Sequence, residues 1–305
     1  FLEYVIMCDT KINDIIKGYN KRDIMKGFVD SCVFFLQKEF SQRGFKKGVL
    51  GLSGGIDSAV VAALGVLALG SENLKVLLMP SLSSSPIHFN DALNLAKILN
   101  LTPQVIKLES FQSHFASHLG FENDLLKSDL DDRQKLRMGN FCSRLRMALL
   151  YDYASAENAL VLGTSNKSEL VLGYGTIFGD LAYAINPIGS LYKTQIFALA
   201  KHLNLPQNLI NKKPSADLFA NQSDENDLGY SYEEIDSFLM CFENLGGLKA
   251  GQKDERDCIQ NALESQGFKS QMVKSLCTRI WINAFKRTMP SVFAFSNPPC
   301  ITHQN

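Results

Sequence analysis

Short apolar runs alternate along the chain with longer amphipathic stretches. Four of these runs have the length and composition of buried strands, at 48–52, 75–80, 104–108 and 159–162. Helical spacing of apolar residues fills the intervals before and between them, over 24–44, 57–69, 90–99 and 137–157. Because strands and helices alternate with short connections, the pattern predicts an α/β fold: a doubly wound, mainly parallel sheet with helices on both faces.

Helices dominate the rest of the predicted fold. They are expected over 193–202, 231–241, 254–265 and 269–285, so the chain should close with C-terminal helices. No internal repeat or interdomain linker divides the sequence, and 305 residues suffice for one large core. We therefore expect a single domain over 23–290, an N-terminal extension over 1–22 and a C-terminal tail over 291–305.

The turn between the first strand and the next helix carries the clearest chemistry. It comprises Gly51, Leu52, Ser53, Gly54, Gly55, Ile56, Asp57 and Ser58. A glycine turn that leads from a strand into a helix directs free backbone N–H groups at one point, where a phosphate can bind. Ser53 and Ser58 can donate to phosphate oxygens. The Asp57 carboxylate fits this setting if it holds a Mg²⁺ that bridges to the phosphates.

Two common nucleotide loops are excluded by the residues of this turn. The Lys-Ser/Thr pair of G-x-x-x-x-G-K-[ST] is missing, and so is the glycine spacing of G-x-G-x-x-G. The alternative is a Ser/Gly turn in which Asp57 or Ser58 only caps the helix. The flanking strand and helix favour a phosphate loop.

Polar residues also follow the last predicted strand. Residues 163–169, GTSNKSE, place hydroxyls, an amide, a lysine and Glu169 directly after 159–162. Because ligands of parallel sheets bind beyond the carboxyl ends of the strands, Glu169 and Asp57 are expected to meet at one Mg²⁺. The glycine-rich segment 173–180 comes next, and it either shapes a loop against a ligand or is an ordinary connection.

Charge and cysteine usage narrow the class of protein. The 31 basic and 31 acidic residues balance, so no net field draws the chain to nucleic acid or to an anionic membrane. No apolar run reaches the ~20 residues that a membrane span needs, and residues 1–7 lack a signal-peptide pattern. The seven cysteines are scattered and include no C-x-x-C pair. This usage predicts reduced thiols in the cytoplasm rather than disulfides or a zinc site.

Some other clusters have simpler interpretations. His114 and His118 have the spacing of a metal pair on a helix, but no third ligand is evident nearby, so surface histidines are favoured. Segment 122–137 is dense in charge, which favours a solvated loop over a segment that orders on substrate. Arg144 and Arg146 lie two apart on a predicted helix, so at most one of them lines a given site.

Six segments beyond the loop identify a family when they are taken in order. The loop itself, S-G-G-x-D-S, is typical of N-type ATP pyrophosphatases and does not choose among them. The later segments are GNFCSRLRM at 139–147, GTSNKSE at 163–169, GYGTIFGD at 173–180, NPIG at 186–189, PSADL at 214–218 and DENDLGY at 224–230. Together they resemble the NAD synthetase family over about residues 24–290.

The resemblance implies a Rossmann-like fold of the adenine nucleotide alpha hydrolase type and a ligase activity. Deamido-NAD (nicotinic acid adenine dinucleotide) would be amidated to NAD, the last step of NAD biosynthesis. Its nicotinate carboxylate attacks the α-phosphorus of ATP, pyrophosphate leaves, and ammonia then displaces AMP from the acyl-adenylate. Such an enzyme mainly positions two anions and neutralises charge on the leaving pyrophosphate.

The family's residue roles carry over to the positions that match its motifs. Asp57, Glu169 and Lys193 would be catalytic, with Asp57 and Glu169 as the Mg²⁺ ligands. ATP, as co-substrate, would contact residues 51–58, Thr164, Lys193 and Ser215. Deamido-NAD would contact Asn140, Arg144, Asp180, Phe285 and Lys286.

The chain departs from the family's pattern at several positions. Phe285 stands where His is usual, Ser215 where Thr is usual, and Met138 where Lys is common. Ile177 and Ala184 replace a Lys and an Asp that touch deamido-NAD in many members. These changes bear on dinucleotide binding and leave the ATP chemistry intact.

The resemblance also implies a nitrogen source and an assembly. Glutamine-dependent members carry a large N-terminal glutaminase domain, whereas here the phosphate loop already begins near residue 51. Free ammonia, or ammonia delivered by another protein, is therefore the expected donor. The family is homodimeric with the dinucleotide at the subunit interface, and we expect the same of this chain.

Two other functions stay open at this point. A tRNA-modifying N-type pyrophosphatase would need a basic surface or catalytic cysteines, which the neutral charge and scattered thiols disfavour. A nucleotide-binding regulator without catalysis would not need Asp57, Glu169 and Lys193 to be intact.

Overall fold

One parallel sheet organises the computed structural model, which describes residues 21–121, 124–125, 130–214 and 223–293. Within these residues the strands are β1 (Lys47–Gly51), β2 (Leu74–Leu78), β3 (Pro103–Val105) and β4 (Ala159–Val161). All pairings are parallel and the strand order is β3-β2-β1-β4. Strand β1 therefore lies in the interior of the sheet, with β2 and β4 as its neighbours. The predicted parallel α/β fold is confirmed.

Helices account for most of the other described residues. Their bounds are α3 (Lys21–Gln42), α4 (Ile56–Leu69), α5 (Pro86–Ile98), α6 (Glu109–His118), α8 (Asp132–Glu157), α9 (Lys167–Leu172), α10 (Lys193–His202), α11 (Gln207–Ile210), α12 (Asp224–Leu228), α13 (Tyr232–Asn244), α14 (Lys253–Ser265) and α15 (Ser270–Ile282). Short 3-10 helices are present at Ser71–Asn73 and Ala284–Arg287.

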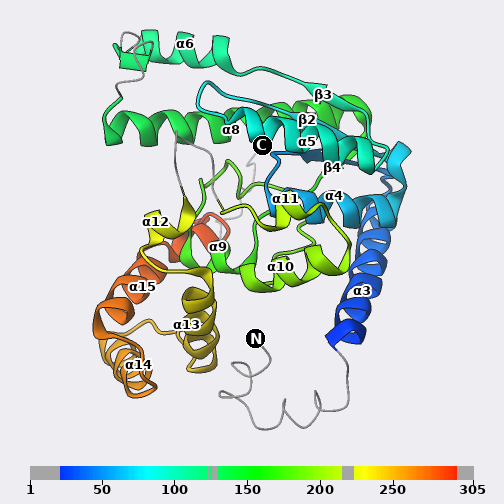
Figure 1. Ribbon diagram of the computed structural model, residues 1–305. Helices are drawn as coiled ribbons and strands as arrows, with labels where there is room; N and C mark the ends of the chain where they lie inside the picture. The colour runs from blue at the N-terminus through cyan, green and yellow to red at the C-terminus, as the bar shows by residue number, and fades with distance from the viewer. Residues whose placement is uncertain (1–20, 122–123, 126–129, 215–222, 294–305) are drawn as a thin grey trace, which may run out of the picture.

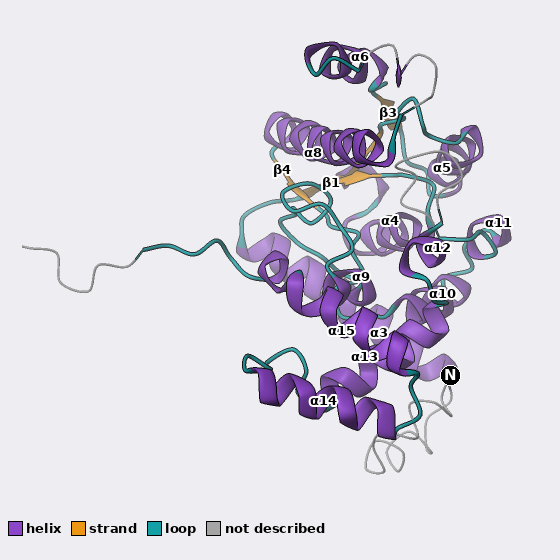
Figure 2. Cartoon of the chain, turned by 90° about the vertical axis from the view of Figure 1, so that its left-hand side faces the viewer, coloured by secondary structure: helices purple, strands orange, loops and turns teal. Residues whose placement is uncertain are grey.

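The sheet is covered on both faces because the apolar side chains of its strands alternate in direction. Val49 and Leu77 point into a core that α8 and α6 cover. Leu50 and Val76 point into the opposite core, formed with α3, α4, α5 and α10. Figures 1 and 2 show α8 and α6 on one side of the strands, and α4 followed by α10 on the other.

A third apolar cluster stands apart from the sheet. It is built by α13, α14 and α15 around Phe238, Phe242 and Leu276, and it includes Val171 and Leu172 of α9. Both views place α13–α15 at the far end of the molecule from α6 (Figures 1 and 2). Because α9 begins just after β4, this cluster abuts the carboxyl end of the sheet.

Most differences from the predicted elements lie at helix ends, where local hydrogen bonds decide. Helix α5 begins at Pro86, four residues before the predicted start, because Ser85 accepts a bond from the Ile87 N–H and Pro86 fits the first turn. Helix α8 begins at Asp132, where Asp131 and Gln134 form a capping box. The loop predicted for 122–137 is therefore wrong from residue 132 onward.

The third strand is shorter than its predicted range of 104–108. Regular pairing ends at Val105, yet the Ile106 and Leu108 N–H groups still donate to carbonyls of the β2 segment, at 2.9 Å each. Helices α9, α11 and α12 were not predicted, because four to six residues do not display a helical period.

The predicted extension over 1–22 and the tail over 291–305 fall almost entirely outside the described residues, so the domain boundaries stay predictions. No helix in the described ranges combines the length and hydropathy required to cross a membrane.

Candidate active site

The predicted phosphate loop leaves the sheet at its interior strand. Strand β1 ends at Gly51, and the Leu52 N–H still donates to the Leu77 carbonyl at 2.9 Å. Helix α4 begins at Ile56, and its N-cap residue Gly55 offers no side-chain acceptor. The first N–H groups of α4 are therefore left to a ligand or solvent, as phosphate binding requires.

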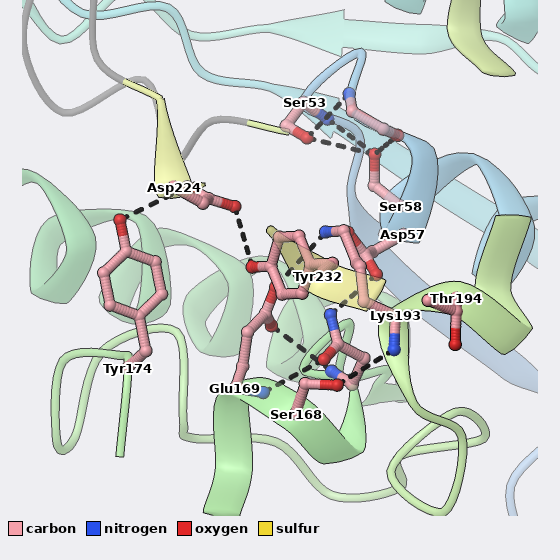
Figure 3. Close-up of polar contacts among 12 residues, drawn as sticks. Ser53, Asp57, Ser58, Ser168, Glu169, Tyr174, Lys193, Thr194, Asp224 and Tyr232 are labelled. Atoms are coloured by element: carbon pink, nitrogen blue, oxygen red, sulfur yellow. Dashed lines mark hydrogen bonds and ion pairs between the residues drawn. The ribbon is translucent and has the colours of Figure 1, made fainter. Parts of the chain in front are cut away.

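Two hydroxyls close the loop on itself. The Oγ atoms of Ser53 and Ser58 lie 3.0 Å apart, and Ser58 Oγ donates to the Gly55 carbonyl at 3.0 Å. Ser53 Oγ also accepts from the Gly55 N–H at 3.2 Å. Figure 3 shows both hydroxyls on the same side of the turn as Asp57. The loop thus holds its shape without a ligand, and its serines can turn their protons toward phosphate oxygens.

Gly54 is fixed by groups that lie behind the loop. It has φ +80°, and a Cβ atom there would stand 2.0 Å from the His88 carbonyl oxygen. The Lys212 ammonium donates to the Gly54 carbonyl at 3.1 Å and forms a short ion pair with the buried Asp91. Asn208 of α11 donates to the other Asp91 oxygen at 2.6 Å. Only glycine fits this peptide, which is therefore held against α5.

Asp57, Glu169 and Lys193, predicted to act together, are brought together by the ends of two neighbouring strands. Asp57 lies in the first turn of α4 after β1, and Glu169 lies in the first turn of α9 after β4. Lys193 opens α10, is 2% exposed, and places its Nζ 2.5 Å from Asp57 Oδ2 and 3.4 Å from Glu169 Oε1. Figure 3 shows this cluster beneath the phosphate loop.

Burial sets the protonation of this cluster. It raises the pKa of the Glu169 carboxyl to about 8, and the nearby Lys193 ammonium only partly opposes the rise. Burial alone would lower the pKa of Lys193, but the carboxylates of Asp57 and Glu169 outweigh it and raise that pKa above its ordinary value. Lys193 therefore stays charged, and Glu169 accepts a proton readily unless another cation approaches it.

Asn166 joins the two carboxylates. Its Nδ2 donates to Asp57 Oδ1 at 3.0 Å, while its Oδ1 accepts from the Glu169 N–H at 3.0 Å. The Glu169 side chain in turn accepts from the Asn166 N–H, which completes a capping box for α9. Asn166 is fully buried, so its side-chain amide orients the Asp57 carboxylate, and its backbone N–H the Glu169 carboxylate, without competition from water.

A third buried carboxylate, Asp224, faces the same cluster from α12. Its oxygens accept from the hydroxyls of Tyr174 at 3.2 Å and Tyr232 at 3.1 Å. The Tyr232 ring lies 5.2 Å from the Lys193 ammonium, a cation–π distance. Burial raises the pKa of Asp224, and Lys193 and the tyrosine bonds oppose that shift. Asp224 thus adds negative charge beside Lys193 (Figure 3).

A cavity of about 670 Å³ opens beyond the carboxyl ends of the strands. The phosphate loop, Thr164, Glu169 and Lys193 line one part of it, and Asn140, Asp180 and Lys286 also line it. The predicted ATP and deamido-NAD contacts therefore share one cavity, with volume for a ligand of nucleotide size.

Asn140 of α8 and Asp180 of the glycine-rich segment, both predicted to contact deamido-NAD, are linked through Thr176. Asn140 Oδ1 accepts from the Thr176 hydroxyl at 2.8 Å. Asp180 Oδ1 accepts from the Thr176 N–H at 2.7 Å and from the Ser143 hydroxyl at 2.8 Å. These bonds tie segment 173–180 to α8, so the segment shapes a loop against the cavity and is not a free connection.

The two residues of the C-terminal segment that are predicted to contact deamido-NAD lie differently with respect to the cavity. Lys286 lines the cavity, but its ammonium is held by the carbonyls of Gly173 and Gly175, at 2.9 Å each. Phe285 is 56% exposed and does not line the cavity. Arg287 likewise donates to a backbone carbonyl, that of Val171, at 2.6 Å. This segment therefore fixes the glycine-rich loop in place.

Arg144, another predicted contact, does not reach the cavity in the described chain. Arg144 is exposed on α8 and does not line the cavity, whereas Arg146 does line it and donates to the Met79 carbonyl at 3.1 Å. The contact of Arg144 with deamido-NAD therefore stays a prediction. Ser215 lies outside the described residues.

The donor set fits a Mg²⁺ ion only together with a nucleotide. Among the described residues, no three His, Cys, Asp or Glu side chains are grouped as metal ligands. His114 and His118 bond instead to backbone carbonyls one helical turn earlier. Asp57 and Glu169 already converge on a cation, the Lys193 ammonium. Two carboxylates completed by phosphate oxygens and water are the usual Mg²⁺ environment.

Sequence reasoning missed three polar residues that support this site: Asn166, Asp224 and Lys212. Asn166 had a readable signal, since N-x-x-E before an apolar run is a capping pattern. Asp224 stood in the 224–230 segment without a role of its own, and Lys212 had no signal, because their partners are brought close only by the fold. Lys212, for example, meets Asp91 across 121 residues of sequence.

Comparison with known proteins identifies the family. The sequence model of NAD synthase matches residues 28–290. An NH₃-dependent NAD⁺ synthetase of Helicobacter hepaticus is 63% identical over 272 residues, which are 89% of this chain and 99% of that protein. Two solved structures superpose closely. An NMN synthetase of Francisella tularensis has TM-score 0.72 and 30% identity over 89% of this chain and 99% of that one. An NH₃-dependent NAD synthetase of Campylobacter jejuni has TM-score 0.68 and 37% identity over 88% and 99%.

These findings agree with the cluster at the ends of β1 and β4 and with the ordered segments of the sequence. The family predicted from those segments is confirmed: the chain belongs to the NAD synthase family.

Proposed function

We propose that this chain is an ammonia-dependent NAD synthetase, a ligase that uses ATP to amidate deamido-NAD to NAD with release of AMP and pyrophosphate. The observation that carries the proposal is the Asp57–Lys193–Glu169 cluster at the ends of two adjacent strands, directly below a self-closed phosphate loop. Family membership makes the chain an enzyme that consumes ATP.

The first step needs an activated carboxylate. The N–H groups at the start of α4 and the hydroxyls of Ser53 and Ser58 would bind the ATP phosphates that leave as pyrophosphate. Lys193 would neutralise charge that develops on this leaving group, since its pKa stays raised beside the carboxylates. The nicotinate carboxylate then attacks the α-phosphorus and forms the mixed anhydride.

Asp57 and Glu169 would hold a Mg²⁺ ion together with the ATP phosphates. When bound, that ion supplies positive charge to the phosphate oxygens. The carboxylates contribute orientation, because Asn166 fixes both of them before any ligand arrives. A preformed pair of this kind avoids reorganisation during the reaction.

The second step needs ammonia at the acyl carbon and a bound acyl-adenylate. Asn140 and Asp180 lie in the same cavity as the phosphate loop, held by Thr176. They would orient the nicotinate end of the dinucleotide, and Lys286 fixes the loop around it. The ammonia nitrogen attacks the acyl carbon, AMP leaves, and the amide forms after loss of a proton.

The nitrogen source and the assembly are part of the proposal. The H. hepaticus relative named NH₃-dependent is covered over 99% of its length, which supports free ammonia as the donor here. Arg144 is exposed on α8, where it is accessible to a ligand bound between two copies of the chain. We therefore propose a homodimer with sites at the interface, located in the cytoplasm.

A second candidate substrate follows from the F. tularensis structure, whose name specifies NMN as the product. The corresponding substrate would be nicotinate mononucleotide, which carries the same carboxylate and lacks the adenylate half. The higher identity to NAD synthetases favours deamido-NAD.

The test uses the full chain with ATP, Mg²⁺ and ammonium chloride. Deamido-NAD and nicotinate mononucleotide are supplied separately, and NAD, NMN and AMP are quantified by chromatography. We expect NAD and AMP in equal amounts, and a much lower kcat/KM for the mononucleotide. Absence of NAD at saturating substrates would refute the proposal. Faster formation of NMN than of NAD would show that nicotinate mononucleotide, not deamido-NAD, is the preferred substrate. Glutamine in place of ammonium is the control and should give no product.

A further inference from the structure

Asp236 is a buried carboxylate that the proposed reaction does not use. It lies in the middle of α13, is 1% exposed, and does not line the cavity. No cation is paired with it among the described residues. Burial raises its pKa, and hydrogen bonds from Ser168 and Thr194, together with the charge of Lys193, oppose that shift. A buried carboxylate without an ion pair costs stability compared with an apolar side chain, unless hydrogen bonds replace its lost hydration. The partners of those hydrogen bonds therefore indicate what the carboxylate does.

Those hydrogen bonds all lead to the start of α10. The Thr194 N–H donates to Asp236 Oδ2 at 2.8 Å, and the Ser168 hydroxyl donates to Asp236 Oδ1 at 2.5 Å. Ser168 Oγ also accepts from the Lys193 N–H at 2.9 Å. Figure 3 shows Ser168 beneath Lys193, with the bond between them. The backbone of Lys193 and of its neighbour is thus anchored to α9 and α13.

Helix α10 has only part of a cap of its own, a bond from the Tyr192 N–H to Gln195 Oε1 at 2.9 Å. Its N-cap residue is Tyr192, which makes no side-chain capping bond. The first N–H groups of a helix have no partner within it, and a carboxylate near them also interacts favourably with the helix dipole. Asp236 and Ser168 supply from two other helices what an N-cap Ser or Asp supplies locally.

The position of the α10 backbone determines where the Lys193 ammonium lies. Lys193 Nζ is 2.5 Å from Asp57 and 3.4 Å from Glu169, so a shift of the α10 backbone would change both contacts. Ser168 directly precedes Glu169, so the same carboxylate steadies the helix that carries Glu169. One buried group therefore governs two members of the cluster.

We propose that Asp236 is a positioning residue, which caps α10 from α13 and so holds the Lys193 ammonium at the phosphate site. This inference rests on the proposed function, because its effect is read in the amidation reaction. It also assigns a role to the helical cluster α13–α15: the cluster supplies a fixed carboxylate to the catalytic end of the sheet.

The test compares Asp236→Asn in two backgrounds, the natural chain and Lys193→Met. The single amide oxygen of Asn can still accept from the Thr194 N–H. The amide NH₂ group then faces the Ser168 hydroxyl and cannot accept its proton. In the natural background we expect kcat to fall on the order of 10- to 100-fold with KM for ATP changed less than about twofold. In the Lys193→Met background we expect no further loss, because Asp236 acts through Lys193.

Two further variants keep the result interpretable. Ser168→Ala should reproduce the kcat loss, and its combination with Asp236→Asn should be less than additive. Glu233→Gln, at an exposed position of the same helix, should leave kcat unchanged. The folded fraction of each variant is measured by circular dichroism and thermal unfolding, so that activity is expressed per folded molecule.

Distinct outcomes separate the inference from the proposed function. If the natural chain makes no NAD, the proposed function fails. If the natural chain is active but Asp236→Asn lowers kcat equally in both backgrounds, Asp236 is only structural. The inference is also overturned if the activity per folded Asp236→Asn molecule equals that of the natural chain.

Discussion

The two strand ends that form the site are built in different ways. At the end of β1, the loop from Ser53 to Ser58 is closed by its own hydroxyls and backbone. At the end of β4, Glu169 and the neighbouring Lys193 depend on bonds from Asn166, Ser168 and Asp236, spread over 70 residues of sequence. The first half of the site is mainly local, with a distant support from Lys212 to the Gly54 carbonyl, and the second is assembled by the fold.

This difference has a physical reason. A phosphate loop works through backbone N–H groups, so glycine and serine suffice and sequence-near contacts fix its shape. A buried ammonium between two carboxylates must be held at a fixed distance from each, because electrostatic interactions are strong in a low dielectric. Only packing from several helices can supply that constraint.

The largest expected effect comes from Asp57, where the two halves meet. Asp57→Asn removes the charge nearest to Lys193 Nζ and half of the proposed Mg²⁺ site. We expect kcat/KM to fall on the order of 10³-fold. We also expect Mg²⁺ and ATP to raise the thermal unfolding temperature less than they do in the natural chain. Steady-state kinetics and calorimetry measure both. Asp132→Asn is the matched control, since that carboxylate is fully exposed at the start of α8; near-natural activity of Asp57→Asn would contradict the assignment.

The local half can be broken alone by Gly54→Ala. The new methyl group would lie 2.0 Å from the His88 carbonyl, at a φ of +80° that alanine rarely adopts. We expect kcat/KM for ATP to fall by about 10²-fold, mainly through KM, since the loop that binds phosphate must shift. Gly27→Ala is the control: no atom lies within 4 Å of its Cβ position in α3, and stability should be unchanged or slightly increased. An unchanged KM for ATP in Gly54→Ala would exclude the loop as the phosphate site.

The assembled half of the site should make the stability of the protein depend on pH, which is a smaller effect than the two activity losses above. Burial raises the pKa of Glu169 to about 8, whereas the unfolded chain releases that proton near the ordinary 4.5. Between these values the folded state binds more protons, so the free energy of unfolding decreases as pH rises. Without metal we expect a decrease on the order of 2 kcal/mol from pH 5.5 to 8, measured by denaturant unfolding in EDTA.

Glu169→Gln should remove most of that slope, because its side chain does not titrate. Asp224 and Asp236 also have pKa values raised by burial, so any slope that remains should be strongest at the acidic end. A free energy of unfolding that rises with pH in this window would show that Glu169 is ionised in the metal-free protein.

The same contrast explains how far the sequence could be interpreted. The four strands and the longer helices were predictable from their periods, and the Ser53–Ser58 loop from its composition. Asp57, Glu169 and Lys193 were predicted to act together through family resemblance, and the structure brings them together. Their roles in catalysis are still predictions.

The supporting residues could not be predicted in the same way. Asp236 accepts hydrogen bonds from Thr194, 42 residues away in sequence, and from Ser168, 68 residues away. The residues next to Asp236 in the sequence give no sign that a carboxylate is needed there. Arg144 matches a family motif and Phe285 replaces a family His, yet both side chains lie away from the cavity in the single chain. A motif specifies residue types, whereas direction and burial depend on packing with distant elements.

The most direct test of the central claim follows an oxygen atom. The phosphate loop and the Asp57–Lys193–Glu169 cluster line one cavity, and the proposed function requires a carboxylate to attack the α-phosphorus of ATP there. Deamido-NAD labelled with ¹⁸O in its nicotinate carboxylate is converted with ATP and ammonium, and the products are analysed by mass spectrometry. The account predicts one ¹⁸O atom in AMP and none in pyrophosphate. Unlabelled AMP, or ADP with labelled inorganic phosphate, would contradict it.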